Sequence, residues 1–140
     1  MRRSRAFLLD TYSPMEYSSC VWWMGESDIF ARRLRRYQKR HPDETLAVLD
    51  NLDTFMRALN SGVRPAQIQA GFVHREPQSV IAIDQSGAPR KLRETRLYCY
   101  PCEPEETVYV ITIGDKNSQH ADLQDCREFV ERLRTESSGG

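Results

Sequence analysis

The sequence predicts an α+β fold with an N-terminal helical hairpin, an antiparallel sheet of about four strands and a C-terminal helix. Three observations support this. Apolar residues recur at helical spacing between residues 27 and 62, four short apolar runs follow Pro65, and an amphipathic segment closes the chain. A chain of 140 residues has room for one domain with its own core. We therefore expect a single domain over residues 1–140.

Residues 1–26 form an N-terminal lead-in that is irregular or partly extended. Its apolar anchors are residues 7–9 and 21–24, and one or both are candidate strands. The start is basic like a signal peptide, but its apolar stretch ends at Asp10. No apolar run reaches the length of about 20 residues that spans a bilayer. We expect a cytoplasmic protein that does not contact a membrane.

The helical hairpin is predicted from two amphipathic segments. Ser27 can cap the first helix, whose apolar side holds Phe30, Leu34 and Tyr37. The sequence from His41 to Glu44 indicates a break and a new helix start. Gly62 is a suitable end for this second helix. Its apolar stripe consists of Leu46, Leu49, Leu52, Phe55, Met56 and Leu59.

After Pro65 the pattern changes to short apolar runs at residues 71–75, 79–84, 92–100 and 107–113. The segments between them are short, so neighbouring strands should pair antiparallel as a meander. Residues 108–111 are apolar on both faces, which predicts a central strand covered by helices on at least one side. The last helix should start near Asn117 or Ser118, and residues 135–140 should form a flexible tail. This helix should bury Leu123, Cys126, Phe129, Val130 and Leu133.

The formal net charge of zero conceals a segregation of charges along the chain. Residues 1–40 carry nine Lys or Arg against four Asp or Glu, whereas residues 101–140 carry four against nine. A neutral protein can therefore present a basic patch. The arginine-rich run at residues 32–36 is either part of such a patch, with Arg32 and Arg36 as candidate RNA contacts, or the solvated face of an ordinary helix.

Four cysteines, at positions 20, 99, 102 and 126, should stay reduced in a chain without an export signal. The spacing of Cys99 and Cys102 invites a redox or zinc interpretation. A strand rather than a helix follows this pair, and zinc would need further ligands among Cys126, His120 and His74. We favour a buried, apolar role for Cys99 and expect neither a metal nor a cofactor.

Residues 90–120 carry the most informative chemistry. Alternate side chains of a strand share a face, so Arg96, Tyr98 and Tyr100 should point one way. Guanidinium groups bind phosphate and phenol rings stack on bases, which suits RNA. Lys91 and Arg93 add positive charge at the start of this strand. The alternative is that the arginines pair with nearby acids and the tyrosines only pack on the sheet.

Lys116 and His120 follow the apolar strand. Free backbone N–H groups at the next helix start would help Lys116 attract phosphate. An unperturbed imidazole has a pKa of about 6.5, so histidine suits proton transfer near neutrality, and His120 is the best candidate nearby for an acid or a base. RNA supplies its own 2′-hydroxyl nucleophile, so cleavage needs orientation, charge neutralisation and proton transfer. The candidate catalytic residues are therefore Arg96, Lys116, His120 and Tyr98, while Lys116 as a turn residue and His120 as an ordinary surface residue remain open alternatives.

Two segments carry a family resemblance, namely Lys-Leu-Arg-Glu-Thr-Arg-Leu-Tyr at residues 91–98 and Ile-Gly-Asp-Lys-Asn-Ser-Gln at residues 113–119. Together with the order of the elements, they resemble the RelE/ParE toxin superfamily, in particular its HigB-like and phage-derived members. The resemblance covers residues 27–134 in the order of elements. Its sequence-specific part lies within residues 90–120.

The resemblance implies a RelE-like toxin of a toxin–antitoxin system. Such a protein enters the ribosome, cuts mRNA as a metal-independent endoribonuclease and is inhibited by a cognate antitoxin. Arg93, Arg96, Tyr98 and Lys116 occupy positions where such toxins place RNA-contacting groups. ParE-like relatives share the fold but act on DNA gyrase, so the alternative is a non-enzymatic gyrase poison or a phage accessory binding protein of the same fold.

Overall fold

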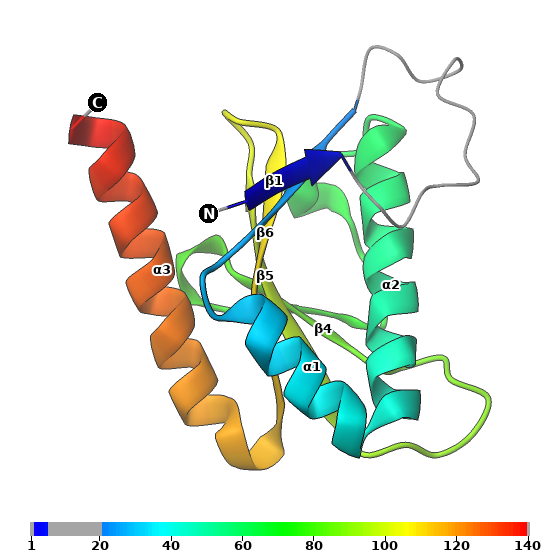
Figure 1. The fold of residues 1–140 in the computed structure, drawn as a ribbon. Helices are drawn as coiled ribbons and strands as arrows, with labels where there is room; N and C mark the ends of the chain where they lie inside the picture. Colours follow the sequence, from blue (N-terminus) through cyan, green and yellow to red (C-terminus); the bar gives the residue numbers. More distant parts are fainter. Residues whose placement is uncertain (1, 6–20, 140) are drawn as a thin grey trace.

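A six-stranded mixed sheet lies between two helical layers in the computed structural model, which describes residues 2–5 and 21–139. Helices α1 and α2 cover one face of the sheet, and α3 covers the other (Figure 1). The predicted α+β class and the closing helix are confirmed. The elements are β1 (Arg2–Arg5), β2 (Trp23–Glu26), α1 (Phe30–Arg40), α2 (Pro42–Asn60), β3 (Val73–Arg75), β4 (Ile81–Asp84), β5 (Thr95–Cys102), β6 (Thr107–Asp115) and α3 (Gln119–Gly139), with short 3₁₀ turns at Pro65–Gln67, Pro77–Ser79 and Lys116–Ser118.

The sheet has the strand order β1-β2-β6-β5-β4-β3, and strands β3 to β6 form the predicted antiparallel meander. The expectation of about four strands was too low. Strand β2 comes from the lead-in and pairs parallel with β6, and β1 pairs antiparallel with β2. A four-residue strand that pairs with a partner some eighty residues later leaves no local turn signal. The apolar anchor at residues 7–9 lies outside the described residues.

Helices α1 and α2 follow one another with only His41 between them and diverge from this point (Figure 1). Both predicted helices are present, with Pro42 at the first position of α2. The predicted cap is absent. Ser27 instead donates its hydroxyl hydrogen to the carbonyl oxygen of Ile111 at 2.7 Å, and α1 begins only at Phe30. Ser27 thus ties the start of α1 to the central strand.

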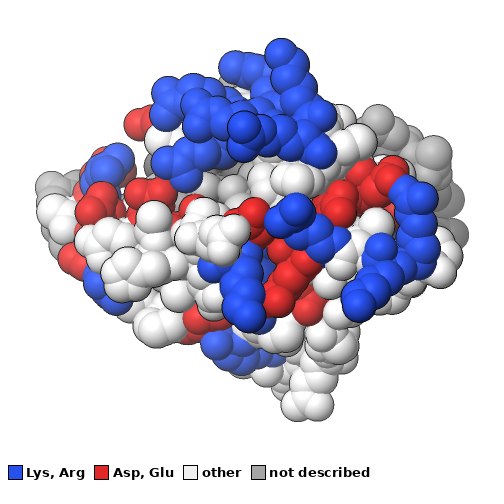
Figure 2. Space-filling model, turned by 90° about the horizontal axis from the view of Figure 1, so that it is seen from below, with Lys and Arg blue, Asp and Glu red and all other residues white. Residues whose placement is uncertain are grey.

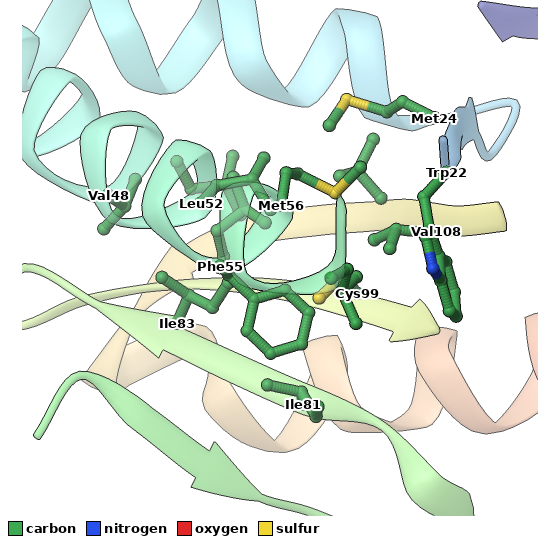
Figure 3. Packing of buried hydrophobic residues seen from close by; sticks show 14 of the residues in the cluster. Trp22, Met24, Val48, Leu52, Phe55, Met56, Ile81, Ile83, Cys99 and Val108 are labelled. Atoms are coloured by element: carbon green, nitrogen blue, oxygen red, sulfur yellow. The ribbon is translucent and has the colours of Figure 1, made fainter. Parts of the chain in front are cut away.

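Buried apolar residues form one cluster on each face of the sheet. Figure 3 shows the cluster beneath α2, where Leu52, Phe55 and Met56 pack over Ile81 and Cys99. Leu46, which the sequence pattern placed in the same stripe, is 61% exposed. The second cluster lies beneath α3 and contains Tyr98, Tyr109, Ile111, Cys126, Phe129, Val130 and Leu133.

The central strand β6 contributes to both clusters, as predicted for a strand that is apolar on both faces. Its register against β5 slips by one residue between Tyr98 and Cys99, which leaves Ile111 without an opposing partner. Because of this bulge, Ile111 and Ile113 pack on opposite faces although they are two residues apart.

Helix α3 continues to Gly139 and so extends into the segment, residues 135–140, that we expect to be a flexible tail. The flexibility of this segment stays a prediction. The hydroxyl group of Thr135 donates to the carbonyl oxygen of Glu131, four residues earlier. Threonine side chains make this bond within helices. Within residues 2–5 and 21–139, no helix combines the length and the apolar character needed to cross a membrane.

Candidate nucleic-acid interface

Helix α1 presents a dense group of positive charges. Its sequence Phe-Ala-Arg-Arg-Leu-Arg-Arg-Tyr-Gln-Lys-Arg contains no acidic residue. Figure 2 views the molecule from below and shows a continuous patch of Lys and Arg side chains along its upper edge. The apolar side of α1 packs on the core through Phe30, Leu34 and Tyr37. We define the basic face of α1 as its exposed cationic residues, which are Arg32, Arg35, Arg36, Lys39 and Arg40.

These five side chains make no ion pair with any residue that the structure describes. Cations that are not neutralised by nearby carboxylates create a positive potential, even on a protein without net charge. The two predicted RNA contacts on this helix, Arg32 and Arg36, therefore lie on a surface with the expected electrostatic character.

Arg33 has a different role from its neighbours in α1. Its Nη1 atom lies 3.1 Å from Thr112 Oγ1, 3.2 Å from Asp125 Oδ2 and 3.8 Å from Asp122 Oδ1. Arg33 thus connects α1 to the central strand and to α3. The sequence pattern did not separate Arg33 from the other arginines, because its acidic partners lie some ninety residues away in the chain.

A cleft of about 410 Å³ separates α1 from the junction between β6 and α3. Arg33, Arg36, Tyr37 and Arg40 line one wall, and His41 lies at its end. The opposite wall is formed by Ile113, Gly114, Asp115, Ser118, Ala121 and Asp122. The basic face of α1 thus extends into a cleft that also contains carboxylates.

The junction itself is closely packed around Gly114. A Cβ atom at this position would lie 2.2 Å from both Asp122 Oδ2 and Ser118 Oγ, so only glycine fits without movement. Ser118 donates to Asp122 Oδ2 at 2.7 Å. Burial raises the pKa of Asp122 to about 6, while Ser118 and Arg33 act in the opposite direction.

The predicted phosphate site at the helix start is already filled by a carboxylate. Asp115 Oδ1 accepts hydrogen bonds from the backbone N–H groups of Asn117 at 2.9 Å and Ser118 at 3.3 Å. These are the groups that we expected to attract phosphate. Lys116 is the first residue of this turn and His120 lies just after it. Both are exposed, but neither lines the cleft.

On β5, the register places Arg96, Tyr98 and Tyr100 on one face, as predicted. That face is not open, because α3 packs on it. Tyr98 has no exposed surface, and burial raises its pKa well above the ordinary value. Tyr100 is half-buried against the same cluster. Tyr98 therefore cannot stack on a base or carry a proton to a substrate in this structure.

Arg96 is held by acids rather than facing solvent. Its Nη1 lies 3.4 Å from Glu76 Oε2 and its Nη2 lies 3.6 Å from Glu94 Oε1. Its Nε and the Tyr98 hydroxyl are buried without a hydrogen-bond partner among the described residues. The ion-pair alternative considered from the sequence is thus the arrangement observed for Arg96.

The remaining predicted contacts lie at the same end of the molecule as Asp115. Arg93 is exposed, with its Nη1 3.8 Å from Asp115 Oδ2 and its backbone N–H 3.0 Å from Glu44 Oε2. Lys91 is exposed nearby in the chain. The structure therefore groups Arg93 with Asp115 and the cleft, whereas Arg96 and Tyr98 point to the face of the sheet that α3 covers.

The cysteines that the structure describes are buried. Cys99 has no exposed surface, and desolvation raises its pKa to about 12, as expected for a packed apolar residue. Cys102 and Cys126 are also buried as free thiols. Within residues 2–5 and 21–139, no three His, Cys, Asp or Glu side chains are grouped so that they could hold a metal ion.

Comparisons of this chain with protein-family models, with curated protein sequences and with solved structures give no match.

Proposed function

We propose that this chain is an RNA-binding toxin of the RelE/ParE type that cleaves mRNA on the ribosome in the cytoplasm without a metal ion. A cognate antitoxin would be its inhibitory partner. The observation that carries the proposal is the basic face of α1, where five cationic side chains are exposed and unpaired among the described residues. Lys and Arg side chains bind the RNA backbone by neutralising phosphates, and they need no base sequence to do so.

Cleavage would use Lys116 and His120. Both side chains are exposed at the β6–α3 junction, where they would contact a strand bound at this end of the molecule. The imidazole of His120 would remove the proton of the 2′-hydroxyl group or protonate the leaving oxygen. The ammonium group of Lys116 would neutralise the negative charge that develops on the phosphorus oxygens. Arg93 supplies a further cation at this end of the molecule.

The test is expression of the protein in bacterial cells, followed by sequencing of RNA ends. We expect growth arrest and new 5′ ends in mRNA, with the same cleavage when purified protein is dialysed against EDTA and then added to ribosomes in EDTA-free buffer. His120→Ala and Lys116→Ala should abolish cleavage, whereas Arg134→Ala, an exposed cation near the other end of α3, should retain it. Arrested cells with intact RNA would exclude the nuclease.

A non-enzymatic binder of the same fold is the second candidate, and the environment of β5 favours it. Arg96 is engaged by Glu76 and Glu94, and Tyr98 is enclosed, so two of the four predicted catalytic side chains are not available to a substrate. A ParE-like gyrase poison would induce the DNA damage response without cutting RNA. A phage accessory protein would bind its partner without either effect.

A further inference from the structure

The cleft between α1 and the β6–α3 junction contains an aromatic surface as well as cations. The rings of Tyr37 and His41 have centroids 4.7 Å apart and planes inclined by 47°. The Tyr37 hydroxyl is 2.6 Å from Thr95 Oγ1, which fixes this ring at the start of β5. Both residues are only half-buried. His41 therefore presents a ring, supported by Tyr37, on which a planar group can stack.

Two cations beside these rings are available to an anion. Arg36 and Arg40 line the cleft and make no ion pair with the described residues, unlike Arg33, which is bound to Asp125. Arg40 and His41 are adjacent in the chain, and Arg36 lies one helical turn before Arg40. A phosphate at these guanidinium groups would thus lie close to the ring of His41.

The opposite wall offers a hydrogen-bond acceptor. Asp115 Oδ1 already accepts from two backbone N–H groups. Oδ2 accepts no hydrogen bond from the residues that the structure describes, and Arg93 Nη1 lies 3.8 Å from it. A carboxylate oxygen accepts more than one hydrogen bond, so Oδ2 has unused capacity. Uncharged N–H donors, such as the exocyclic amino group of a nucleobase, are suitable partners for this atom.

We propose that this cleft is a subsite for one nucleotide of single-stranded RNA, with selectivity for a base that carries an exocyclic amino group. Arg36 and Arg40 bind its phosphate, the base stacks on His41, and the amino group donates to Asp115. This inference rests on the proposed RNA binding and adds to it which base is preferred. A single strand is required because bases within a duplex do not expose a ring face for stacking.

The test compares two labelled RNA hexamers by fluorescence anisotropy, one of adenosine and one of purine riboside. The two bases differ only in the 6-amino group. We expect the adenosine hexamer to bind on the order of tenfold more tightly, as one hydrogen bond to a charged acceptor provides. Equal affinity for the two hexamers would overturn the inference and leave RNA binding intact. Failure of both hexamers to bind would instead refute the proposed function.

Substitutions at Asp115 and at a control position test whether the preference for the amino-bearing base arises in the cleft. Asp115→Asn keeps an oxygen that can cap the following turn but removes the second acceptor, so it should bring the two affinities together. Asp50→Asn, an exposed acid on α2, is the matched control and should retain the difference. If Asp115→Asn retains it too, Asp115 does not read the base.

The stacking contact is tested separately. His41→Ala should weaken both hexamers by roughly fivefold to a hundredfold, the usual range for the loss of one stacked base. His41→Phe should restore most of the affinity, because it replaces one ring by another. Unchanged binding of His41→Ala, with circular dichroism equal to that of the wild type, would contradict the placement of the base.

Discussion

The basic face of α1 and the α3-covered face of β5 contain the same kinds of side chain but differ in what surrounds them. Arg36 on α1 has no acidic partner among the described residues, whereas Arg96 on β5 lies between Glu76 and Glu94. Tyr37 is half-exposed in a cleft, whereas Tyr98 is enclosed beneath α3. Residue type and strand alternation therefore identify candidate contacts, while packing decides which of them a ligand can reach.

Tyr98→Ala should have the largest effect on stability. Removing a completely buried aromatic ring lowers the free energy of unfolding by about 3–5 kcal/mol. Urea denaturation monitored by circular dichroism measures this loss. Tyr98→Phe is the informative control, because the Tyr98 hydroxyl has no hydrogen-bond partner among the described residues and its removal should be neutral or stabilising. Loss of RNA cleavage in a stable Tyr98→Phe protein would show that the two regions do not differ as described.

Arg96→Ala should have the next largest effect, with a loss of about 1–3 kcal/mol, because it leaves the mostly buried Glu76 without its partner. The same urea experiment on Arg36→Ala should give a change within about 0.5 kcal/mol, as is usual for an exposed residue without partners. Equal losses of unfolding free energy in the two variants would contradict the distinction between Arg96, which is paired with acids, and Arg36, which is not.

The pH dependence of stability tests the burial of Asp122. Its pKa is about 6 in the folded protein, against about 3.9 for an aspartate in an unfolded chain. The folded state therefore binds this proton more tightly, and the contribution of Asp122 to stability decreases as the pH rises from about 4 to about 6. Asp84, whose pKa is lowered by hydrogen bonds from His74 and Ser86 against the effect of its burial, changes stability in the opposite direction.

Asp122→Asn isolates this contribution because Asn keeps an acceptor for Ser118 and does not titrate. The difference in unfolding free energy, variant minus wild type, should grow between pH 4 and pH 6 and then level off. Urea titrations at half-unit intervals of pH measure it. A difference that stays constant over this range would mean that Asp122 is not the titrating group.

Much of the architecture could be predicted because it depends on local patterns. The α2 stripe, the turns after Pro65 and the apolar β6 run each encode an element within a few residues. Strand β2 was only a possible strand, since its identity depends on pairing with β6. Leu46 was misplaced because the helical period defines a stripe but not the width of the partner surface.

The site was less predictable than the fold for a related reason. Alternation correctly grouped Arg96, Tyr98 and Tyr100, but no local signal shows that α3 covers this face. The Asp115 cap could have been recognised, since an acid two and three residues before free N–H groups is a common cap. His41 was interpreted only as a break before Pro42, although its spacing of four residues from Tyr37 places both rings on one side of the helix end.

The most direct test of the central claim is the salt dependence of RNA binding. The affinity of a single-stranded RNA decamer is measured by anisotropy at several salt concentrations for the wild type, for an Arg32→Ala, Arg36→Ala double variant and for Arg96→Ala. If the basic face of α1 contacts phosphates, the double variant should lose roughly 1.4 from the slope of log affinity against log salt, at about 0.7 per contact, while Arg96→Ala keeps the wild-type slope. An unchanged slope for the double variant, or an equal loss for Arg96→Ala, would contradict the account.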